Sequence, residues 1–432
     1  MSKKILIIII IIFITIILGM LTWSFLLKPN TKTTEQTTGV LDFLPFGKNN
    51  DQSTQIPFFN KDELSEKPVV VDNTKRNDSV SVHKLKQVTT TQISGATATT
   101  SQTGETTIRL IERSTGNIFD INTTNSEKKR ITNTTIIASR ETFFNSLGET
   151  LLMRYLNEND VIKTFMGHIQ NPETGKVVEE ELKILSNPAP VGESSGQLTG
   201  TFLEDDITTI ALSPSKDAFF SLAPLGINTI GTVTYFKNNT REQIFSSSFP
   251  EWLTQWPKKD TVTLTTKAAS VADGFFYFLN SSSGKLERVM GNIKGLTTNT
   301  NTDATKVLYS QSVSKSLSLH ALDVKTHTTE SFTIKTLPEK CVWSALQTDI
   351  VYCGVPGRIT EGQYPDFWYQ GIVSFSDTLW KINVSTNTTE LLSVPVTSAR
   401  AEIDVVQPFL NNDETLLLFT NKKDSTLWSL EL

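Results

Sequence analysis

From about residue 84 onward, apolar and polar residues alternate in short runs, a pattern that predicts β-strands rather than helices. One kind of run, usually entered through a polar turn, recurs seven times along the chain. Its copies are Glu105–Ile111, Glu149–Tyr155, Asp217–Leu222, Asp260–Thr265, Thr305–Ser310, Asp349–Cys353 and Glu414–Phe419. Successive copies begin 44, 68, 43, 45, 44 and 65 residues apart, so two insertions interrupt an otherwise regular period.

Most copies are followed by a second run that ends in Asn, Asp or Glu, then by a polar turn and a third run. Asn117–Asn122, Phe276–Asn280 and Leu379–Asn383 are second runs of this kind, and Lys285–Val289 is a third. A repeat of 40–50 residues with four short strands is typical of a β-propeller. Seven copies predict an all-β fold with seven blades, and a solenoid is the alternative for such a period.

The last repeat reaches Leu432 after only three strands, which leaves its blade with an open edge. Upstream of the first blade, Lys84–Thr89 resembles the third-run segment Lys129–Thr132. We therefore expect residues 84–89 to complete the last blade and the propeller to span residues 83–432. Ring closure of this kind fits a propeller and not a solenoid.

The N-terminal part is different, because Ile5–Leu27 is an uncharged and apolar run of 23 residues. As a helix it would be about 34 Å long, enough to cross a hydrocarbon core of about 30 Å. Lys3 and Lys4 favour a short cytoplasmic tail (residues 1–4) and an extracytoplasmic remainder. A cleaved signal peptide is the alternative, but the run exceeds the usual 7–15 residues and lacks an A-x-A-like site.

Residues 28–82 show no sustained period and are rich in Thr, Asn, Asp and Lys. This composition predicts a flexible linker between the membrane helix and the propeller. The apolar island Leu41–Phe46 leaves a second interpretation open, in which it docks on the bilayer or on the folded domain.

Composition limits the function classes further. The chain has 432 residues, of which 38% are hydrophobic, and its net charge of −5 gives no electrostatic support for a nucleic-acid partner. Two cysteines and four scattered histidines suggest no metal site. There is no P-loop, G-x-G-x-x-G or H-E-x-x-H motif, so we expect neither metal nor cofactor.

The two cysteines, Cys341 and Cys353, flank an expected hairpin whose turn is centred on Gln347. In that register Trp343 lies opposite Val351, and the cysteines form a directly opposed pair. A structural disulfide in an oxidising compartment is the first interpretation. Two buried free thiols, or redox or metal chemistry, are the alternatives.

Two polar turns carry a resemblance to a known family. Leu212–Asp217 and Trp256–Asp260 resemble the S-P-D-G turns of TolB-like and WD-repeat-like propellers, and strands such as Leu379–Asn383 are similar to theirs. Together with the anchor and the linker, the chain resembles membrane-anchored bacterial propeller proteins. The resemblance covers residues 84–432 and implies a fold rather than an activity. The G-H…W-D signature of true WD repeats is absent, and so is the S-x-D-x-G-x-x-W motif of sialidases.

The insertion Pro356–Asp377 contains the best candidate for a binding site. Its aromatic and polar residues are Tyr364, Asp366, Trp368, Tyr369 and Gln370. Aromatic faces stack on sugars and bind cations, and long loops on a rigid scaffold often carry function. The alternative is a loop that folds back and packs on its own aromatic side chains.

Three other motifs predict structure rather than chemistry. Gly192–Gly196 matches G-x-S-x-G, but prolines precede it and no helix follows, so a loop is expected. Glu179–Glu181 and Glu204–Asp206 lack the ligand spacing of a calcium loop and predict solvated acidic faces.

These observations favour a binding or scaffold module for a protein, peptide or envelope polymer, with no catalysis evident. The alternative is an extracytoplasmic hydrolase or lyase with acids at the channel mouth. It requires several carboxylates to converge, from a set comprising Asp205, Asp206, Asp273, Asp366 and Asp377. A third hypothesis is a purely structural envelope protein, and fold-level analogy does not choose among the three.

Overall fold

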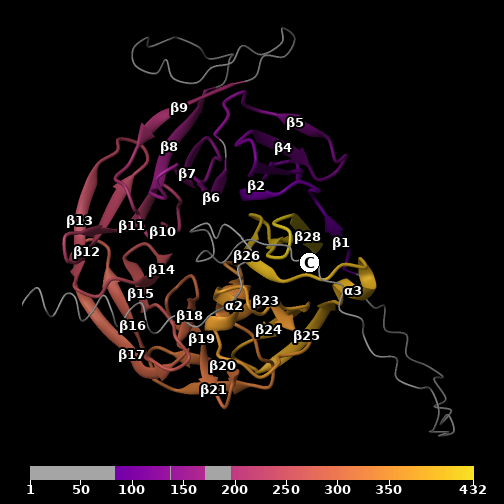
Figure 1. The fold of residues 1–432 in the computed structure, drawn as a ribbon. Helices are drawn as coiled ribbons and strands as arrows, with labels where there is room; N and C mark the ends of the chain where they lie inside the picture. Colours follow the sequence, from indigo (N-terminus) through magenta and orange to yellow (C-terminus); the bar gives the residue numbers. More distant parts are fainter. Residues whose placement is uncertain (1–82, 137, 171–195) are drawn as a thin grey trace, which may run out of the picture. The chain divides into compact units, whose positions relative to one another are not determined.

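Seven antiparallel four-stranded sheets form the part of the chain that the computed structural model describes, residues 83–136, 138–170 and 196–432. The sheets follow one another around a ring as the blades of a β-propeller (Figure 1). The all-β, seven-bladed architecture predicted from the repeat is therefore confirmed.

Each blade has an innermost, a second, a third and an outermost strand. The innermost strands are β2 (Ile93–Thr100), β6 (Ser139–Phe144), β10 (Thr209–Leu212), β14 (Trp252–Lys258), β18 (Thr297–Thr300), β22 (Cys341–Trp343) and β26 (Val405–Leu410). The second strands are β3 (Thr106–Glu112), β7 (Thr150–Leu156), β11 (Ala218–Leu225), β15 (Thr261–Thr266), β19 (Lys306–Val313), β23 (Ile350–Pro356) and β27 (Leu416–Asn421).

The third strands are β4 (Ile118–Asn122), β8 (Ile162–Gln170), β12 (Asn228–Tyr235), β16 (Asp273–Asn280), β20 (Ser316–Asp323), β24 (Asp377–Asn383) and β28 (Leu427–Glu431). The outermost strands are β5 (Lys128–Arg130), β9 (Gln197–Phe202), β13 (Arg241–Ser247), β17 (Leu286–Lys294), β21 (Thr329–Phe332), β25 (Thr388–Ser393) and β1 (Leu85–Gln87). Three short helices lie in the connections: η3 (Pro338–Lys340), α2 (Asp366–Tyr369) and α3 (Pro395–Ser398).

All seven copies of the repeated run coincide with second strands, whereas the innermost strands were not identified from the pattern. Their sequences explain the difference, since β18 reads Thr-Thr-Asn-Thr and β22 has only three residues. Thr297 and Thr300 of β18 are nonetheless buried. Neighbouring blades surround these strands on both faces, so burial there does not require an alternating apolar pattern.

Side chains at the turns explain why a polar segment precedes each repeated strand. Ser213 Oγ accepts the backbone N–H groups of Asp217 and Ala218 at 3.2 and 3.1 Å. Asn301 Oδ1 accepts the N–H of Thr305 at 3.0 Å in the same way. Because Ser and Asn caps of this kind satisfy the turn's own backbone donors, the polar residues set where the second strand begins.

A second kind of turn accounts for the Asn or Asp at the end of the third strands. Asn280 Oδ1 accepts the N–H groups of Ser282 and Ser283 at 3.2 and 2.8 Å. Asp323 makes the equivalent bonds to Lys325 and Thr326. These are Asx turns, which reverse the chain toward the outermost strand.

The seventh blade joins the two ends of the propeller. β1 pairs antiparallel with β28, with Leu85 opposite Leu430 and Gln87 opposite Trp428. It forms the outermost strand of the sheet β1-β28-β27-β26 and lies within the segment 84–89 expected to close the ring. The last blade thereby gains a fourth strand beside β28.

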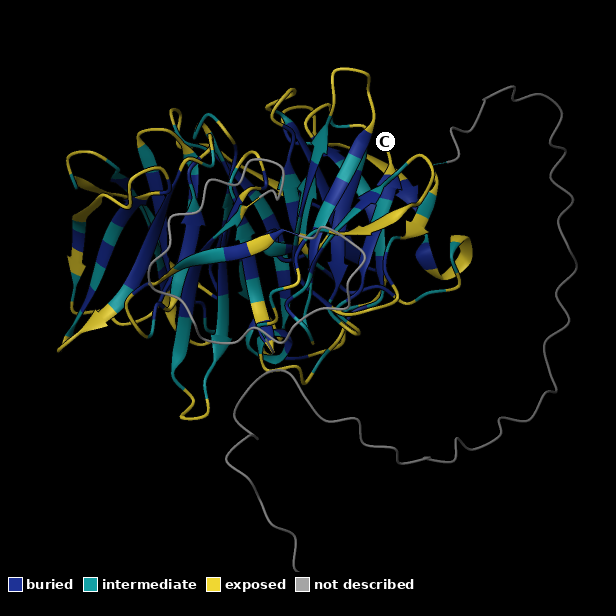
Figure 2. Cartoon of the chain, turned by 90° about the horizontal axis from the view of Figure 1, so that it is seen from above, coloured by how far each residue is buried: buried dark blue, intermediate teal, exposed yellow. Residues whose placement is uncertain are grey.

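Apolar side chains from adjacent blades pack against each other all the way round the ring. Blades 7 and 1 share one such cluster, in which Leu418 and Leu427 meet Ile108 and Leu110. The other pairs of neighbouring blades have equivalent clusters. In Figure 2 the strand cores are accordingly buried and the loops at both ends are exposed. Each repeat of the sequence thus contributes to one apolar core between two neighbouring blades.

The antiparallel strands run between two ends of the ring, and each end carries a different set of loops. Loops between second and third strands emerge at the same end as the connections between blades, because strand direction alternates. We call this end the upper rim; its second-to-third-strand loops are residues 113–117, 157–161, 226–227, 267–272, 314–315, 357–376 and 422–426. β1 begins at the opposite end.

The predicted membrane helix, Ile5–Leu27, and the linker 28–82 lie outside the described residues. None of the helices in the described ranges has the length and apolarity needed to cross a bilayer.

Candidate functional site

The insertion of blade 6, residues 357–376, folds inward on its own aromatic side chains. Tyr364 and Trp368 are buried, and both rings stack with Phe375 at centroid distances of 5.8 and 6.4 Å. The apolar cluster also includes Leu317 and Leu337 from blade 5 and the segment leading to blade 6. The loop therefore packs on its own aromatic side chains, which was the second of the two interpretations. The faces of Tyr364 and Trp368 are not accessible to a ligand.

The remaining candidate residues tie the insertion to other blades. The carboxylate of Asp366 accepts the backbone N–H of Ser270, in blade 4, at 2.7 Å. Tyr369 donates its hydroxyl to Glu339 of η3, and Gln370 is exposed. In Figure 1 α2 projects near the centre of the ring, consistent with contacts that reach several blades. Asp366 and Tyr369 thus act as structural contacts within the upper rim.

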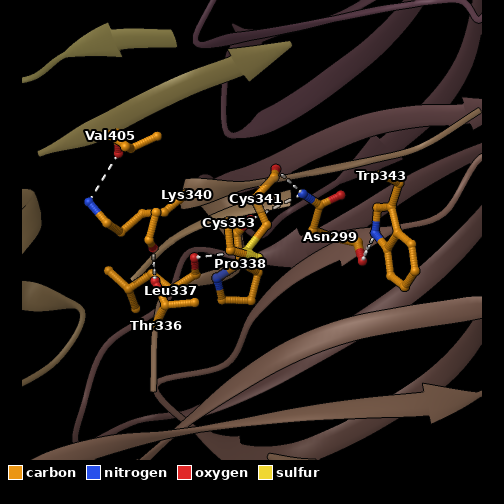
Figure 3. Close-up of a disulfide and its surroundings, with 10 residues drawn as sticks. Asn299, Thr336, Leu337, Pro338, Lys340, Cys341, Trp343, Cys353 and Val405 are labelled. Atoms are coloured by element: carbon orange, nitrogen blue, oxygen red, sulfur yellow. Dashed lines mark hydrogen bonds between the residues drawn. A yellow bond between two sulfur atoms is a disulfide. The ribbon is translucent and has the colours of Figure 1, made fainter. Parts of the chain in front are cut away.

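A cluster of buried charges lies beneath the insertion. Lys340, Asp377 and Asp404 have no exposed side-chain surface. Lys340 Nζ lies 2.7 Å from Asp377 and also donates to Asp404. It donates in addition to the carbonyl of Val405 at 3.0 Å (Figure 3). Since a lone buried ammonium would be very costly, the two carboxylates are what make burial of this lysine feasible.

Asp404 is the most heavily bonded group of this cluster. Besides Lys340 it accepts the indole N–H of Trp368 at 3.0 Å, the hydroxyl of Ser374 and the backbone N–H of Phe375. Burial alone would raise the pKa of Asp404, but Lys340 and these hydrogen bonds together hold it below its ordinary value. Asp404 therefore remains ionised and fixes the insertion to blade 7.

Asp377 behaves oppositely although it contacts the same lysine. Burial, reinforced by the charge of Asp404 and opposed by Lys340, raises the pKa of Asp377 to about 6. Its Oδ2 accepts the N–H of Val405 at 2.7 Å, whereas its Oδ1 is buried with no hydrogen-bond partner. The cluster thus holds one firmly ionised carboxylate and one that takes up a proton in mildly acidic solution.

A second lysine closes the cluster toward solvent. Lys422 Nζ lies 4.2 Å from the centroid of the Trp368 ring and donates to the carbonyl of the same residue. Burial lowers the pKa of Lys422 to about 8. Two cations therefore lie close to the Trp368 ring, because Lys340 Nζ is 5.1 Å from the same centroid.

The two cysteines form a disulfide between the first two strands of blade 6 (Figure 3). Cys341 of β22 and Cys353 of β23 are directly opposed with Cα atoms 4.1 Å apart, and Trp343 pairs with Val351. Asn299 of blade 5 donates its amide to the carbonyl of Cys341 at 2.7 Å. The bond therefore fastens the start of blade 6 immediately after Lys340.

The acids required by the hydrolase or lyase hypothesis do not share partners in the described structure. Asp205 pairs with Lys163 at 2.7 Å, Asp206 accepts the N–H of Ile162, and Asp366 and Asp377 have the separate partners described above. Asp273 begins β16 and is exposed. Within the described ranges no three His, Cys, Asp or Glu residues are grouped as metal ligands would be.

Other sequence motifs have structural surroundings or fall outside the described ranges. His320 bonds to Ser318 and Ser331 and stacks on Tyr309, and burial lowers its pKa. Glu204 forms an exposed ion pair with Arg241. Glu179–Glu181 and residues 192–195 of the G-x-S-x-G motif lie outside the described residues.

The upper rim carries exposed aliphatic side chains in or beside the second-to-third-strand loops of four consecutive blades. They are Leu225 and Ile227 in blade 3, Val271 in blade 4, Val313 in blade 5 and Ile372 in blade 6, with exposed fractions of 67, 91, 71, 44 and 62%. The equivalent loops of blades 7, 1 and 2 carry no large exposed apolar side chain. No motif in the sequence marked these residues, because each is a single apolar residue in an otherwise ordinary turn.

A groove of about 320 Å³ lies next to this aliphatic arc, between blades 5 and 6. It is lined by Ser316, Thr333, Ile334, Lys335, Val355, Pro356, Gly357, Arg358 and Ile359. Lys335 and Arg358 are exposed, and neither forms an ion pair with any described residue. A smaller cavity of about 190 Å³ differs, since its lysine, Lys306, is already bonded to Asp349 and Ser385.

No family model matches the chain, and no curated protein matches it in sequence. Solved propeller structures are similar to it in fold. Oligogalacturonate lyase in complex with manganese has a TM-score of 0.53 and 11% identity, over 83% of this chain and 95% of that chain. The β-propeller domain of the Trilobed protease from Pyrococcus furiosus has a TM-score of 0.48 and 11% identity, over 78% and 92%.

TolB from Acinetobacter baumannii is also similar, with a TM-score of 0.39 and 9% identity over 78% of this chain and 63% of that chain. At these identities each likeness is one of fold alone. The propeller fold that the resemblance to TolB-like proteins implied is confirmed by the seven four-stranded sheets of this chain.

Proposed function

We propose that this chain is a membrane-anchored, extracytoplasmic β-propeller that binds a protein partner through its upper rim. The observation that carries the proposal is the arc of five exposed aliphatic residues on blades 3 to 6. Single exposed apolar residues are ordinary on protein surfaces, but a run of them on one end of consecutive blades is typical of an interaction surface.

The rigidity of the rim supports the same function. The insertion is held to blades 4 and 7 by Asp366 and Asp404, so the arc is presented on a fixed frame. A preorganised surface loses little conformational entropy on binding. The predicted helix Ile5–Leu27 and linker 28–82 would tether the propeller to the membrane and raise its effective concentration for membrane partners.

The experiment is a pulldown from detergent-solubilised native membranes with the tagged full-length protein. The test variant replaces Leu225, Ile227, Val271 and Ile372 by Ser. The control variant replaces Leu147 and Leu346, which are also 67% exposed but lie at the opposite end of the ring. We expect a partner recovered by the native and control proteins to fall to background with the test variant.

Equal recovery by all three proteins would place binding elsewhere and contradict the proposal. Thermal unfolding of each variant serves as the folding control, because substitutions at exposed sites change stability by only about 0.5 kcal/mol.

A further inference from the structure

The groove between blades 5 and 6 combines two features that point to one kind of ligand. Its floor is aliphatic, with Ile334, Val355, Pro356 and Ile359 among its lining residues. Its rim carries two cations, Lys335 and Arg358, that have no acidic partner among the described residues. Lys335 follows outermost strand β21 by three residues, and Arg358 lies two residues after β23, so two separate elements bring the cations to one cavity.

We propose that this groove binds an acidic, aliphatic peptide segment of the partner, with a carboxylate between Lys335 and Arg358. The inference rests on the proposed function and identifies the chemistry of the segment that the partner offers. Arg binds carboxylates through two parallel hydrogen bonds, and hydrogen bonds to charged groups are the stronger ones.

The lining favours a peptide over an acidic polysaccharide. None of the residues that line the groove is aromatic, whereas sugar rings are usually held against aromatic faces. Aliphatic side chains next to hydroxyl groups, here Ser316 and Thr333, instead suit the side chains and backbone of a peptide. The volume of about 320 Å³ is at the lower end of the range of about 300–1,000 Å³ for ligand pockets.

The position of the groove connects it to the aliphatic arc. Ser316 begins β20 directly after the hairpin that carries Val313. On the other side, Arg358 and Ile359 lead into the insertion that carries Ile372, and Gly362 of that insertion donates to the carbonyl of Lys315 at 2.8 Å. One partner segment can therefore contact the arc and place an acidic side chain in the groove.

The test measures binding of the peptide Leu-Glu-Leu-Glu-Leu-NH₂, labelled with fluorescein at its N-terminus, to the full-length protein in nonionic detergent by fluorescence anisotropy. The competing probes are the same peptide with Gln for Glu, the same peptide with Ser for Leu, and a polyuronate of equal charge. The variant is K335Q/R358Q, and the matched control is K237Q/K325Q, which removes two exposed cations outside the groove.

We expect the acidic peptide to bind, and the Gln and Ser peptides to bind at least tenfold more weakly. K335Q/R358Q should lose at least tenfold in affinity, while K237Q/K325Q should change by less than twofold. Removal of a charged hydrogen bond from a binding site typically has an effect of this size or larger.

Three outcomes would overturn the inference: equal binding of the acidic and Gln peptides, unchanged binding by K335Q/R358Q, or binding of the polyuronate in preference to the peptide. These results are separable from the membrane pulldown. A partner lost with the rim variant but retained by K335Q/R358Q leaves the proposed function intact and rejects the groove. Peptide binding in the groove without any partner captured from membranes supports the groove and rejects the proposed function.

Discussion

Lys335 and Lys340 are five residues apart, yet they lie in regions of opposite character. Lys340 has no exposed side-chain surface and is bonded to two carboxylates, whereas Lys335 is exposed at the edge of a groove with no described carboxylate partner. The first region contains the aromatic residues that the sequence favoured for binding, and the second contains none of them. The comparison shows that the closely spaced aromatic residues of this insertion serve its internal packing. Two cations that have no acidic partner among the described residues lie in the groove, where none of these aromatic residues is found.

The largest expected change in the free energy of unfolding comes from a substitution in the buried cluster. Asp404→Asn keeps the size of the side chain but removes one of the two carboxylate charges that face Lys340. We expect the free energy of unfolding to fall by about 3–5 kcal/mol, because the substitution breaks a buried ion pair and also weakens the hydrogen bonds that the Asp404 carboxylate accepts from Trp368 and Phe375. Urea denaturation followed by tryptophan fluorescence measures it.

The control for this variant is Asp205→Asn, which removes an exposed ion pair with Lys163. Its effect should stay below about 1 kcal/mol. Equal losses for the two variants would show that Asp404 has no special structural role.

The disulfide next to Lys340 should have the second-largest effect. Replacing both Cys341 and Cys353 by Ser removes a link between positions separated by 12 residues. We expect a loss of about 2–4 kcal/mol, since a crosslink of this span restricts the unfolded chain. The same urea titration measures it, and native protein with dithiothreitol should unfold at the same urea concentration as the double variant. A double variant as stable as the oxidised protein would contradict the expectation.

The pH dependence of stability sharpens the difference between the two carboxylates of the cluster. The pKa of Asp377 is raised from 3.8 to about 6 in the folded protein, so the folded state holds this proton more tightly than the unfolded state. Its contribution to stability is therefore complete below pH 4 and is lost as the pH rises from about 4 to about 6. We expect native stability, relative to Asp377→Asn, to fall by on the order of 2–3 kcal/mol across that range.

The measurement is a series of urea titrations of both proteins between pH 4 and pH 7. A stability difference that is flat across this range would show that Asp377 is already ionised at pH 4. A difference that increases with pH would reverse the sign of the argument.

The smallest effect on stability belongs to the groove. K335Q/R358Q removes two exposed cations without described acidic partners, so the free energy of unfolding should change by no more than about 0.5 kcal/mol. A loss above 1 kcal/mol in the urea titration would place these side chains among the structural contacts of blades 5 and 6.

Most of the architecture follows from local sequence. The seven repeated runs became second strands, and the polar residues before and after them, such as Ser213 and Asn280, bond the backbone of their own turns. These interactions act over two to five residues, so the linear pattern contains them. The opposed pair Cys341 and Cys353 was predictable for the same reason, since one hairpin register sets it.

The candidate site was less predictable because its contacts join residues far apart in the chain. Tyr364 and Trp368 form an apolar cluster with Leu317 and Leu337, and Asp404, which bonds Trp368, lies 36 residues away. The innermost strands were missed for a related reason. Burial of Thr297 depends on neighbouring blades and not on its own run of residues.

The sequence by itself determined the class of fold and the number of blades, because strand alternation, turn chemistry and a fixed repeat are local properties. Only the tertiary structure decided which polar groups are buried and paired and which face solvent. Lys335 and Lys340 are chemically identical, and the difference between them arises from the ring that brings Asp377 and Asp404 to one of them and not to the other. Burial and charge neutralisation depend on everything within a few ångströms in space, and in a propeller those neighbours come from different blades.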